Sequence, residues 1–192
     1  MKERITNNTF FVGLVVSVCV AVCVGLLQRA GVATDVALAI AIGAADCFLI
    51  ATLRESRRLS KRTAGLALLG GALGLAYFLL TYGGQKVSFA GSPSDYVYYF
   101  LYGTILAPFF EEAILRRLMF FGVAKWVGFV ESGLFVSIIF AVTHWDIIVY
   151  AFAFSVLTCV LAYRGVHTVD RTIMHGAHNL VLQLLFVHGG LQ

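Results

Sequence analysis

Long apolar stretches with few charged positions dominate the pattern along this chain. The first three stretches cover residues 9–27, 31–53 and 63–82. Only the second contains charged residues, Asp35 and Asp46. A helix needs about 20 predominantly apolar residues to cross the hydrocarbon core of a bilayer, and each stretch is close to that length. The pattern therefore predicts three membrane-spanning helices in the first half of the chain.

Polar residues interrupt the apolar pattern in the second half of the chain. Four further stretches there have the character of spans: residues 96–121, 133–145, 147–163 and 172–187. The expected fold is an all-α, polytopic transmembrane helix bundle of about seven spans, with six or eight as the alternatives. We expect one integral membrane domain, with N-terminal membrane helices in residues 1–95 and a polar-cored catalytic part in residues 96–192.

Composition and charge support a membrane location. With 60% hydrophobic and 12% charged residues and a mean hydropathy of +0.89, the chain lies outside the range of soluble domains. Lys and Arg gather in alternate connections, at residues 1–8, 54–62, 116–131 and 163–171. Because positively charged loops stay in the cytoplasm, we expect a multi-pass protein with a cytoplasmic N-terminus. The net charge of +4 is then a topology signal, which favours membrane lipid over nucleic acid as a partner.

Four charges interrupt one apolar run, in the stretch APFFEEAILRR at residues 107–117. A charged side chain at mid-membrane costs about 2.5 to 3.5 kcal/mol on insertion scales, so these groups must face protein or water. Glu112 precedes Arg116 by four residues, which predicts an internal ion pair. Pro108 lacks an N–H and is expected to loosen or kink the helix before the glutamates. The alternative is a helix end at the membrane interface, which we prefer for Arg117 alone.

Two later apolar helices carry histidines. FAVTH places His144 one helical turn after Phe140. HGAHN places His175 and Asn179 on a shared helical face, with His178 farther round and expected to matter little. A single histidine in an apolar helix is commonly a hydrogen-bonded structural residue, and a single asparagine can join two membrane helices. These structural interpretations stay open for each residue taken alone.

Taken together, these side chains are the types that a hydrolytic site needs. A carboxylate or an imidazole can take a proton from water. An imidazole N–H and an amide NH2 can donate hydrogen bonds to an oxyanion. The other common hydrolase signatures, HExxH and GxSxG, are absent from the sequence.

Three short motifs follow one another on successive hydrophobic helices: Glu111-Glu112-x-x-x-Arg116, Phe140-x-x-x-His144 and His175-x-x-x-Asn179. In this order they resemble the motifs of the CAAX protease and bacteriocin-processing family of intramembrane endopeptidases. The resemblance covers about residues 96–187. It implies a helical membrane fold around a water-accessible cavity, and a peptide or a membrane-associated protein as the substrate.

The resemblance also implies a role for each motif residue. It assigns water activation to Glu111 and His144, oxyanion stabilisation to His175 and Asn179, and structural support to Glu112 and Arg116. Zinc is a second mechanistic alternative, because Glu111, His144 and His175 are residue types that hold catalytic zinc with an open position. We favour the metal-free mechanism.

Two other functions compete with a protease. One is a non-catalytic immunity or peptide-binding membrane protein of the same fold. The other, less favoured, is an ion transporter that uses the same buried acids and imidazoles. Many transporters contain inverted repeats, and no repeat is evident in this sequence.

Overall fold

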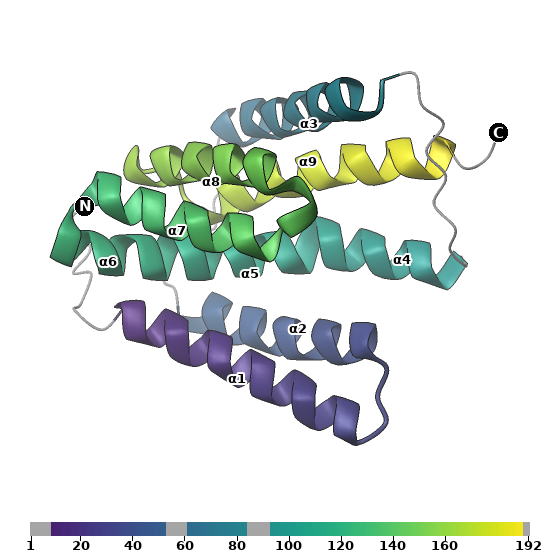
Figure 1. Cartoon of the computed structure of the whole chain (residues 1–192), viewed down its shortest axis with the longest axis horizontal. Helices are drawn as coiled ribbons and strands as arrows, with labels where there is room; N and C mark the ends of the chain where they lie inside the picture. Colours follow the sequence, from purple (N-terminus) through teal and green to yellow (C-terminus); the bar gives the residue numbers. More distant parts are fainter. Residues whose placement is uncertain (1–8, 53–60, 84–92, 190–192) are drawn as a thin grey trace. The chain divides into compact units, whose positions relative to one another are not determined.

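The computed structural model describes residues 9–52, 61–83 and 93–189, and all regular structure in these ranges is helical (Figure 1). This confirms the all-α prediction. Two segments are π-helical (η1 and η2) and one is a 3-10 turn (η3). The elements are α1 (Thr9–Arg29), α2 (Thr34–Thr52), α3 (Lys61–Tyr82), α4 (Pro93–Leu101), η1 (Tyr102–Leu106), α5 (Ala107–Glu111), η2 (Glu112–Met119), α6 (Phe120–Val127), α7 (Phe129–Thr143), η3 (Trp145–Ile147), α8 (Ile148–Tyr163) and α9 (Thr168–Gly189).

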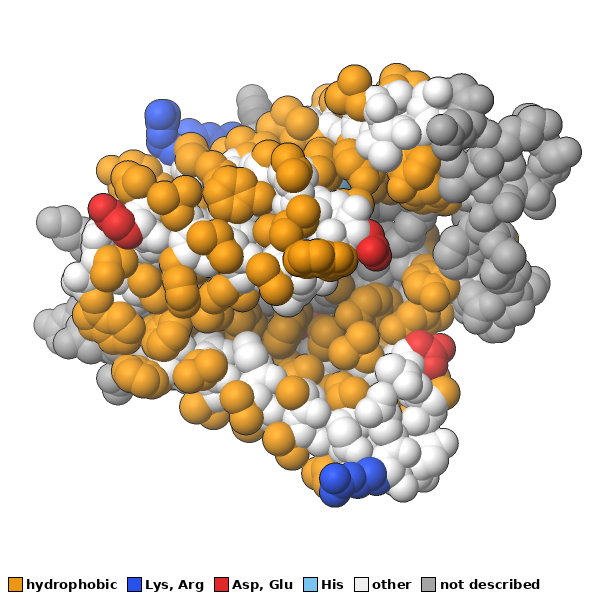
Figure 2. Space-filling model, in the orientation of Figure 1, with side chains coloured by type: hydrophobic (Ala, Val, Ile, Leu, Met, Phe, Trp, Pro, Cys, Tyr) orange, Lys and Arg blue, Asp and Glu red, His pale blue; other side chains and the backbone are white. Residues whose placement is uncertain are grey.

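Several helices expose apolar side chains that water would not favour. Leu80 on α3 is 88% exposed and Val149 on α8 is 80% exposed. Figure 2 shows hydrophobic side chains over much of the visible face. Apolar surfaces of this extent are stable in contact with lipid and not with water, so the protein is an integral membrane protein. Among the residues that the structure describes, four helices are long and apolar enough to cross a membrane: Thr9–Arg29, Thr34–Thr52, Arg62–Tyr82 and Trp145–Tyr163.

The stretch expected to connect the fourth and fifth spans is itself mostly helical. Helix α6 continues to Val127 and α7 begins at Phe129, so that only Gly128 separates them. Gly128 has a φ of 100°, a conformation that glycine adopts without a steric penalty. Ser132 then donates a 2.6 Å hydrogen bond to the carbonyl of Phe120, which ties the start of α7 to α6. A single glycine thus makes the turn for which the sequence predicted a longer connection.

The chain divides into two compact units, which are described separately. Unit 1 contains Met1–Glu55 and Phe110–Thr168, and unit 2 contains Ser56–Phe109 and Val169–Gln192. Each unit takes helices from both halves of the chain. The functional division at residue 95 rests on polar composition and stays a prediction.

In unit 1, helix α7 packs along helix α8 with small polar side chains between them. Ser137 of α7 and Thr158 of α8 are both fully buried. Ser137 Oγ lies 4.0 Å from the Sγ of Cys159. At one end of the pair, the rings of Phe129 and Tyr163 lie 4.9 Å apart. Small residues let membrane helices approach closely, so this interface holds the two helices that flank the charged residues of η2.

In unit 2, helix α3 packs on helix α9 through two glycines one turn apart. A Cβ on Gly70 would overlap the carbonyl of Met174, and one on Gly74 would lie 2.6 Å from the carbonyl oxygen of His178. Only glycine permits so close an approach, and the Gly-x-x-x-Gly spacing is typical of packed membrane helices. Helix α3 therefore fixes the helix that carries the third motif.

Candidate functional site

Two π-helical segments flank the short helix α5, with η1 before it and η2 after it. Pro108 in α5 has no N–H and cannot donate to the carbonyl of Thr104 one turn earlier. The sequence predicted a loosened or kinked helix here, and the structure has π-helical bonding on both sides of the proline segment. Such segments are rare and often occur at functional sites. The second one begins at Glu112, within the first motif.

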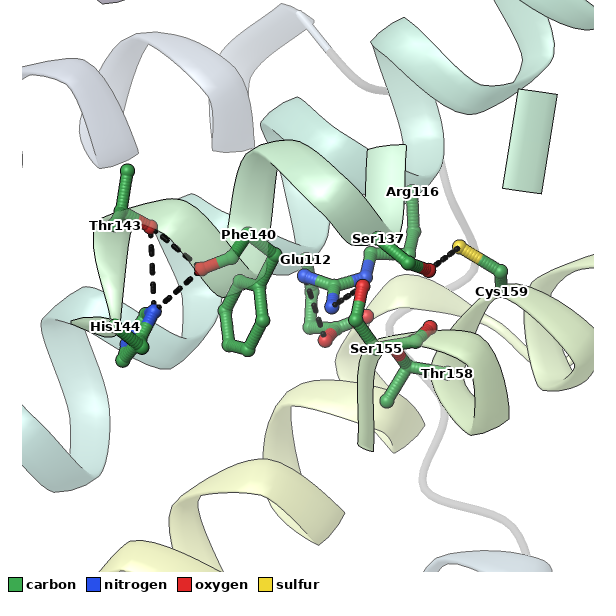
Figure 3. A network of polar contacts seen from close by, with 9 residues as sticks. All are labelled: Glu112, Arg116, Ser137, Phe140, Thr143, His144, Ser155, Thr158 and Cys159. Carbon is green, nitrogen blue, oxygen red and sulfur yellow. Dashed lines mark hydrogen bonds and ion pairs between the residues drawn. The ribbon is translucent and has the colours of Figure 1, made fainter. Parts of the chain in front are cut away.

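A buried ion pair lies in unit 1 (Figure 3). Arg116 Nη1 lies 3.6 Å from Glu112 Oε1, and both side chains are fully buried. This confirms the ion pair that the spacing predicted. Arg116 Nη2 also donates a 2.8 Å hydrogen bond to the hydroxyl of Ser155 on α8. A buried charge is stable only where such partners compensate for the loss of water.

Phe140 of α7 lies between Arg116 and His144, as Figure 3 shows. The Cζ atom of Arg116 lies 4.5 Å from the centroid of the Phe140 ring. A cation over a ring face is attracted by the ring quadrupole. The ring of His144 lies near that of Phe140, with centroids 4.2 Å apart and an interplanar angle of 32°. Phe140 therefore connects the arginine of the first motif to the histidine of the second.

His144 caps the C-terminal end of α7 and is half-buried. The sequence placed it within a span that ran on to Trp145, whereas α7 ends at Thr143. His144 Nδ1 lies 2.9 Å from the carbonyl oxygen of Phe140 and 3.2 Å from Thr143 Oγ1. Because a carbonyl oxygen can only accept, Nδ1 carries the proton of the neutral ring and Nε2 keeps the lone pair. The Nε2 lone pair can therefore accept a proton or bind a metal ion.

The two adjacent glutamates differ in exposure. Glu111 ends α5 and is half-buried, whereas Glu112 is fully buried beside Arg116. Water can reach a half-buried carboxylate, whereas the carboxylate of Glu112 is enclosed together with its counter-charge. This difference favours Glu111 as the proton acceptor and Glu112 as a supporting residue. Arg117 is half-buried, in contrast to Arg116.

In unit 2, Asn179 makes two hydrogen bonds with its side chain. Its Nδ2 donates to the carbonyl of Gly103 in η1 at 2.7 Å, and its Oδ1 accepts from His178 Nδ1 at 2.9 Å. Asn179 thus has the helix-joining role that the sequence left open. An amide NH2 has two donors, so one N–H is not used by the Gly103 bond. His178 orients Asn179, a role that the sequence did not predict for it.

Helix α9 approaches η1 closely at Gly176, directly after His175. A Cβ on Gly176 would overlap the carbonyl oxygen of Thr104. This is the carbonyl to which Pro108 cannot donate. His175 is buried, with 4% of its surface exposed, and its backbone position is set by this contact. Pro108 leaves the Thr104 carbonyl without a helical donor from its own position, and Gly176 lets α9 approach this same carbonyl.

Gln183, one turn after Asn179, makes a second bond of the same kind. Its Nε2 donates to the carbonyl of Tyr99 at 2.9 Å, and its Oε1 lies 3.3 Å from Thr104 Oγ1, which donates to it. Two amides four residues apart on α9 thus bind two carbonyls, of Tyr99 and Gly103, that are also four residues apart. Gln183 had no predicted role, although two amides at this spacing on an apolar helix are a recognisable signal.

The candidate residues are divided between the two units. The structure joins Glu112, Arg116 and His144 within unit 1 by way of Phe140. It joins Asn179 to His178 within unit 2. Their catalytic roles stay predictions. The residues that take part in these networks without an expected role are Phe140, Ser155, His178 and Gln183.

The zinc alternative draws its ligands from both units. Glu111 and His144 belong to unit 1, and His175 belongs to unit 2. Over the part of the chain that the structure describes, no group of three or more His, Cys, Asp or Glu side chains is placed to hold a metal ion. Since this ligand set is divided between the units, zinc stays an open alternative.

Comparison with known families gives one match. A family model described as type II CAAX prenyl endopeptidase Rce1-like matches residues 93–181, which contain all three motifs. No curated protein and no solved structure matches the chain. The match confirms the resemblance to CAAX proteases and supports protease activity in general, at the level of the family. Over residues 93–181, the chain is thus similar to the type II CAAX prenyl endopeptidase Rce1-like family.

Proposed function

We propose that this protein is an intramembrane endopeptidase that hydrolyses a peptide bond in a membrane-associated protein or peptide. The family match supports a protease of the CAAX type. The observation that carries the proposal is the state of His144, whose Nδ1 is engaged by the Phe140 carbonyl. Its Nε2 lone pair is thereby left to accept a proton, as a base in hydrolysis must.

In the proposed reaction, Glu111 and His144 take a proton from a water molecule, whose oxygen attacks the carbonyl carbon of the scissile bond. The carbonyl oxygen becomes an oxyanion. His175 and Asn179 then stabilise the oxyanion by donating hydrogen bonds. The C–N bond breaks, and the proton passes to the leaving amine.

Glu112 and Arg116 support this reaction without contacting the substrate. Both side chains are fully buried, and they pair with each other. Their charges stabilise the η2 segment, which directly follows Glu111. A change in this pair should therefore reduce stability more than chemistry.

Zinc is the alternative activator of the water, with Glu111, His144 and His175 as its ligands. Carboxylate and imidazole are the usual ligand types of catalytic zinc. The bond from His144 Nδ1 to a carbonyl is also the kind that orients metal-binding histidines. The metal would polarise the water and strengthen it as a nucleophile. We favour the metal-free reaction because Glu111 and His144 supply a base without the metal.

We also propose that the N-terminus lies in the cytoplasm, because the basic connections alternate along the chain. Residues 116–131 form one of these basic connections. Arg116 is fully buried and does not count toward its positive charge, so Arg117 and Lys125 remain as its basic residues. Single cysteines at Lys2 and Lys86, in a chain without its native cysteines, should label from opposite sides with a membrane-impermeant reagent. Labelling of both from the outside would contradict the orientation.

The decisive experiment compares cells that carry the wild-type chain, Glu111→Ala or the control Glu131→Ala. Glu131 is an exposed glutamate in the first turn of α7. We expect peptides and membrane-protein termini that appear with the wild type and the control but not with Glu111→Ala. If no product depends on Glu111 while the purified chain still binds peptides, the non-catalytic alternative holds instead.

A further inference from the structure

The Arg116 guanidinium is held by residues from three parts of unit 1. Glu112 of η2 supplies the counter-charge, Phe140 of α7 supplies a ring face, and Ser155 of α8 supplies a hydroxyl. Ser155 is fully buried and belongs to none of the three motifs. Its bond to Arg116 is also the shortest of these contacts, at 2.8 Å.

We propose that Ser155 is a positioning residue for the proposed hydrolysis: its hydroxyl holds the Arg116 guanidinium against Phe140, and Phe140 in turn fixes the ring of His144. The inference rests on the proposed function for its effect on rate. The structural link between Ser155 and His144 can be measured without any reaction.

The three contacts differ in how firmly they fix the orientation of the guanidinium. Its ion pair with Glu112 is 3.6 Å long, beyond the range of a directional hydrogen bond. The attraction to Phe140 acts over a whole ring face and leaves the guanidinium free to slide across it. The bond to Ser155 is short and directional, and the guanidinium is planar and rigid. Ser155 therefore sets the orientation that the other two contacts leave loose.

A shift of Arg116 would reach His144 through Phe140. Phe140 contacts His144 twice, by its ring at 4.2 Å between centroids and by its carbonyl oxygen at 2.9 Å from Nδ1. A movement of Phe140 therefore changes both the position of the imidazole and the bond that selects its tautomer. A displacement of about 1 Å in a catalytic group can lower a rate about 100-fold.

Ser137 provides a matched control for the loss of a buried hydroxyl. It is also fully buried, but it lies on α7 and its hydroxyl contacts the Sγ of Cys159 at 4.0 Å. Ser137→Ala removes the same atom from the same kind of environment. A general effect of repacking would appear in both variants, whereas an effect through Arg116 would appear only at Ser155.

The rate experiment uses the full chain in nanodiscs and single-turnover cleavage of a fluorogenic peptide, with binding followed separately. Ser155→Ala should lower the rate about 10- to 100-fold with little change in substrate affinity. Ser155→Thr keeps the hydroxyl and should retain most of the rate, and Ser137→Ala should match the wild type. A wild-type rate in Ser155→Ala, or an equal loss in Ser137→Ala, would overturn the proposal.

An NMR measurement tests the same link without cleavage. The Hε1 signal of His144, assigned by its loss in His144→Gln, reports on the neighbouring Phe140 ring through the ring current. It should shift in Ser155→Ala and stay in place in Ser137→Ala, and an unchanged signal in Ser155→Ala would refute the link. If the signal shifts as expected but the wild type cleaves no peptide, the link stands and the proposed function fails.

Discussion

The network around Arg116 in unit 1 is charged, fully buried and compensated by other side chains, whereas the network of Asn179 and Gln183 in unit 2 consists of half-buried, neutral amides that bind backbone carbonyls. Arg116 is surrounded by Glu112, Ser155 and Phe140. Asn179 and Gln183 instead donate to the carbonyls of η1 and α4. Both networks lie in apolar helices, but a charge costs much more to place there than an amide does.

The difference in cost indicates what each network does. A charge within a membrane helix costs several kcal/mol, so it persists only with compensating partners or a function. A neutral hydrogen bond between membrane helices contributes only about 0.6 to 2 kcal/mol and joins helices at little cost. The charged network of unit 1 should therefore be intolerant of any single loss, and the amide network of unit 2 should tolerate some losses.

The largest effect should fall on the proposed proton acceptors of unit 1. Glu111→Gln or His144→Ala should lower the cleavage rate by about 100- to 10,000-fold, because general base catalysis is lost. Neither change adds a buried charge, so membrane insertion and folding should be retained. Single-turnover cleavage of a fluorogenic peptide measures the effect, with Glu131→Gln as the control. Near wild-type cleavage in either variant would remove the catalytic assignment.

The next effect concerns the stability of the charged network. Arg116→Met leaves Glu112 buried without its counter-charge and should lower the free energy of unfolding by about 3 to 5 kcal/mol. Glu112→Gln should likewise reduce stability more than the rate of the chemical step. Denaturant unfolding in detergent measures both variants, with Arg117→Met as the half-buried control. Equal losses of unfolding free energy for Arg116→Met and Arg117→Met would show that burial of the arginine does not determine the loss of stability.

The amide network offers a sharper comparison, because Asn179 and Gln183 make equivalent bonds. Asn179→Ala and Gln183→Ala should each cost about 0.6 to 2 kcal/mol of stability. Only Asn179→Ala should lower the cleavage rate, by about 100- to 1000-fold, since only Asn179 is proposed to stabilise the oxyanion. His175→Ala should lower the rate similarly with little effect on binding.

Rate measurements on these variants separate the two roles of Asn179. His178→Ala removes the bond that orients the amide, so it should reduce the rate less than Asn179→Ala does. Equal rate losses in Asn179→Ala and Gln183→Ala would mean that both amides act only by holding the helices together.

The smallest effect is expected from metal removal. Thorough chelation should leave cleavage unchanged, because the favoured mechanism uses Glu111 and His144 alone. Metal analysis of the purified protein should find no stoichiometric zinc. An inactive chelated protein that zinc restores would establish the alternative ligand set of Glu111, His144 and His175.

The sequence predicted those features that depend on composition and short spacing. The length of the apolar stretches predicted the helices, and the four-residue spacing predicted the ion pair of Glu112 and Arg116. The position of His144 at a helix end was missed, because the span was expected to continue to Trp145. A change in helical bonding leaves hydropathy unaltered, so the hydropathy pattern carried no signal of the π segments, and Pro108 predicted only that the helix would be loosened or kinked there.

The supporting residues were harder to predict than the motif residues. A serine within an apolar helix has the pattern of any small packing residue, so nothing in the sequence distinguishes Ser155 from Ser137. What separates them is the neighbour that each hydroxyl meets, which is Arg116 in one case and Cys159 in the other. Contacts between residues far apart in the chain arise from tertiary packing, which a single sequence does not specify.

The π segment η2 also limits how the gene can change in length. A π turn accommodates a residue more than an α turn, because its bonds join residues five apart instead of four. Loss of one codon between Glu112 and Met119 would favour a return to α-helical bonding, in which each residue turns by about 100° about the axis, more than in a π turn. The side chains inside the segment would therefore change direction relative to one another. Arg116 would then turn away from Ser155 and Phe140 even if every named side chain were kept. Surface loops absorb such insertions and deletions, but this stretch is constrained in its number of residues as well as in their identity.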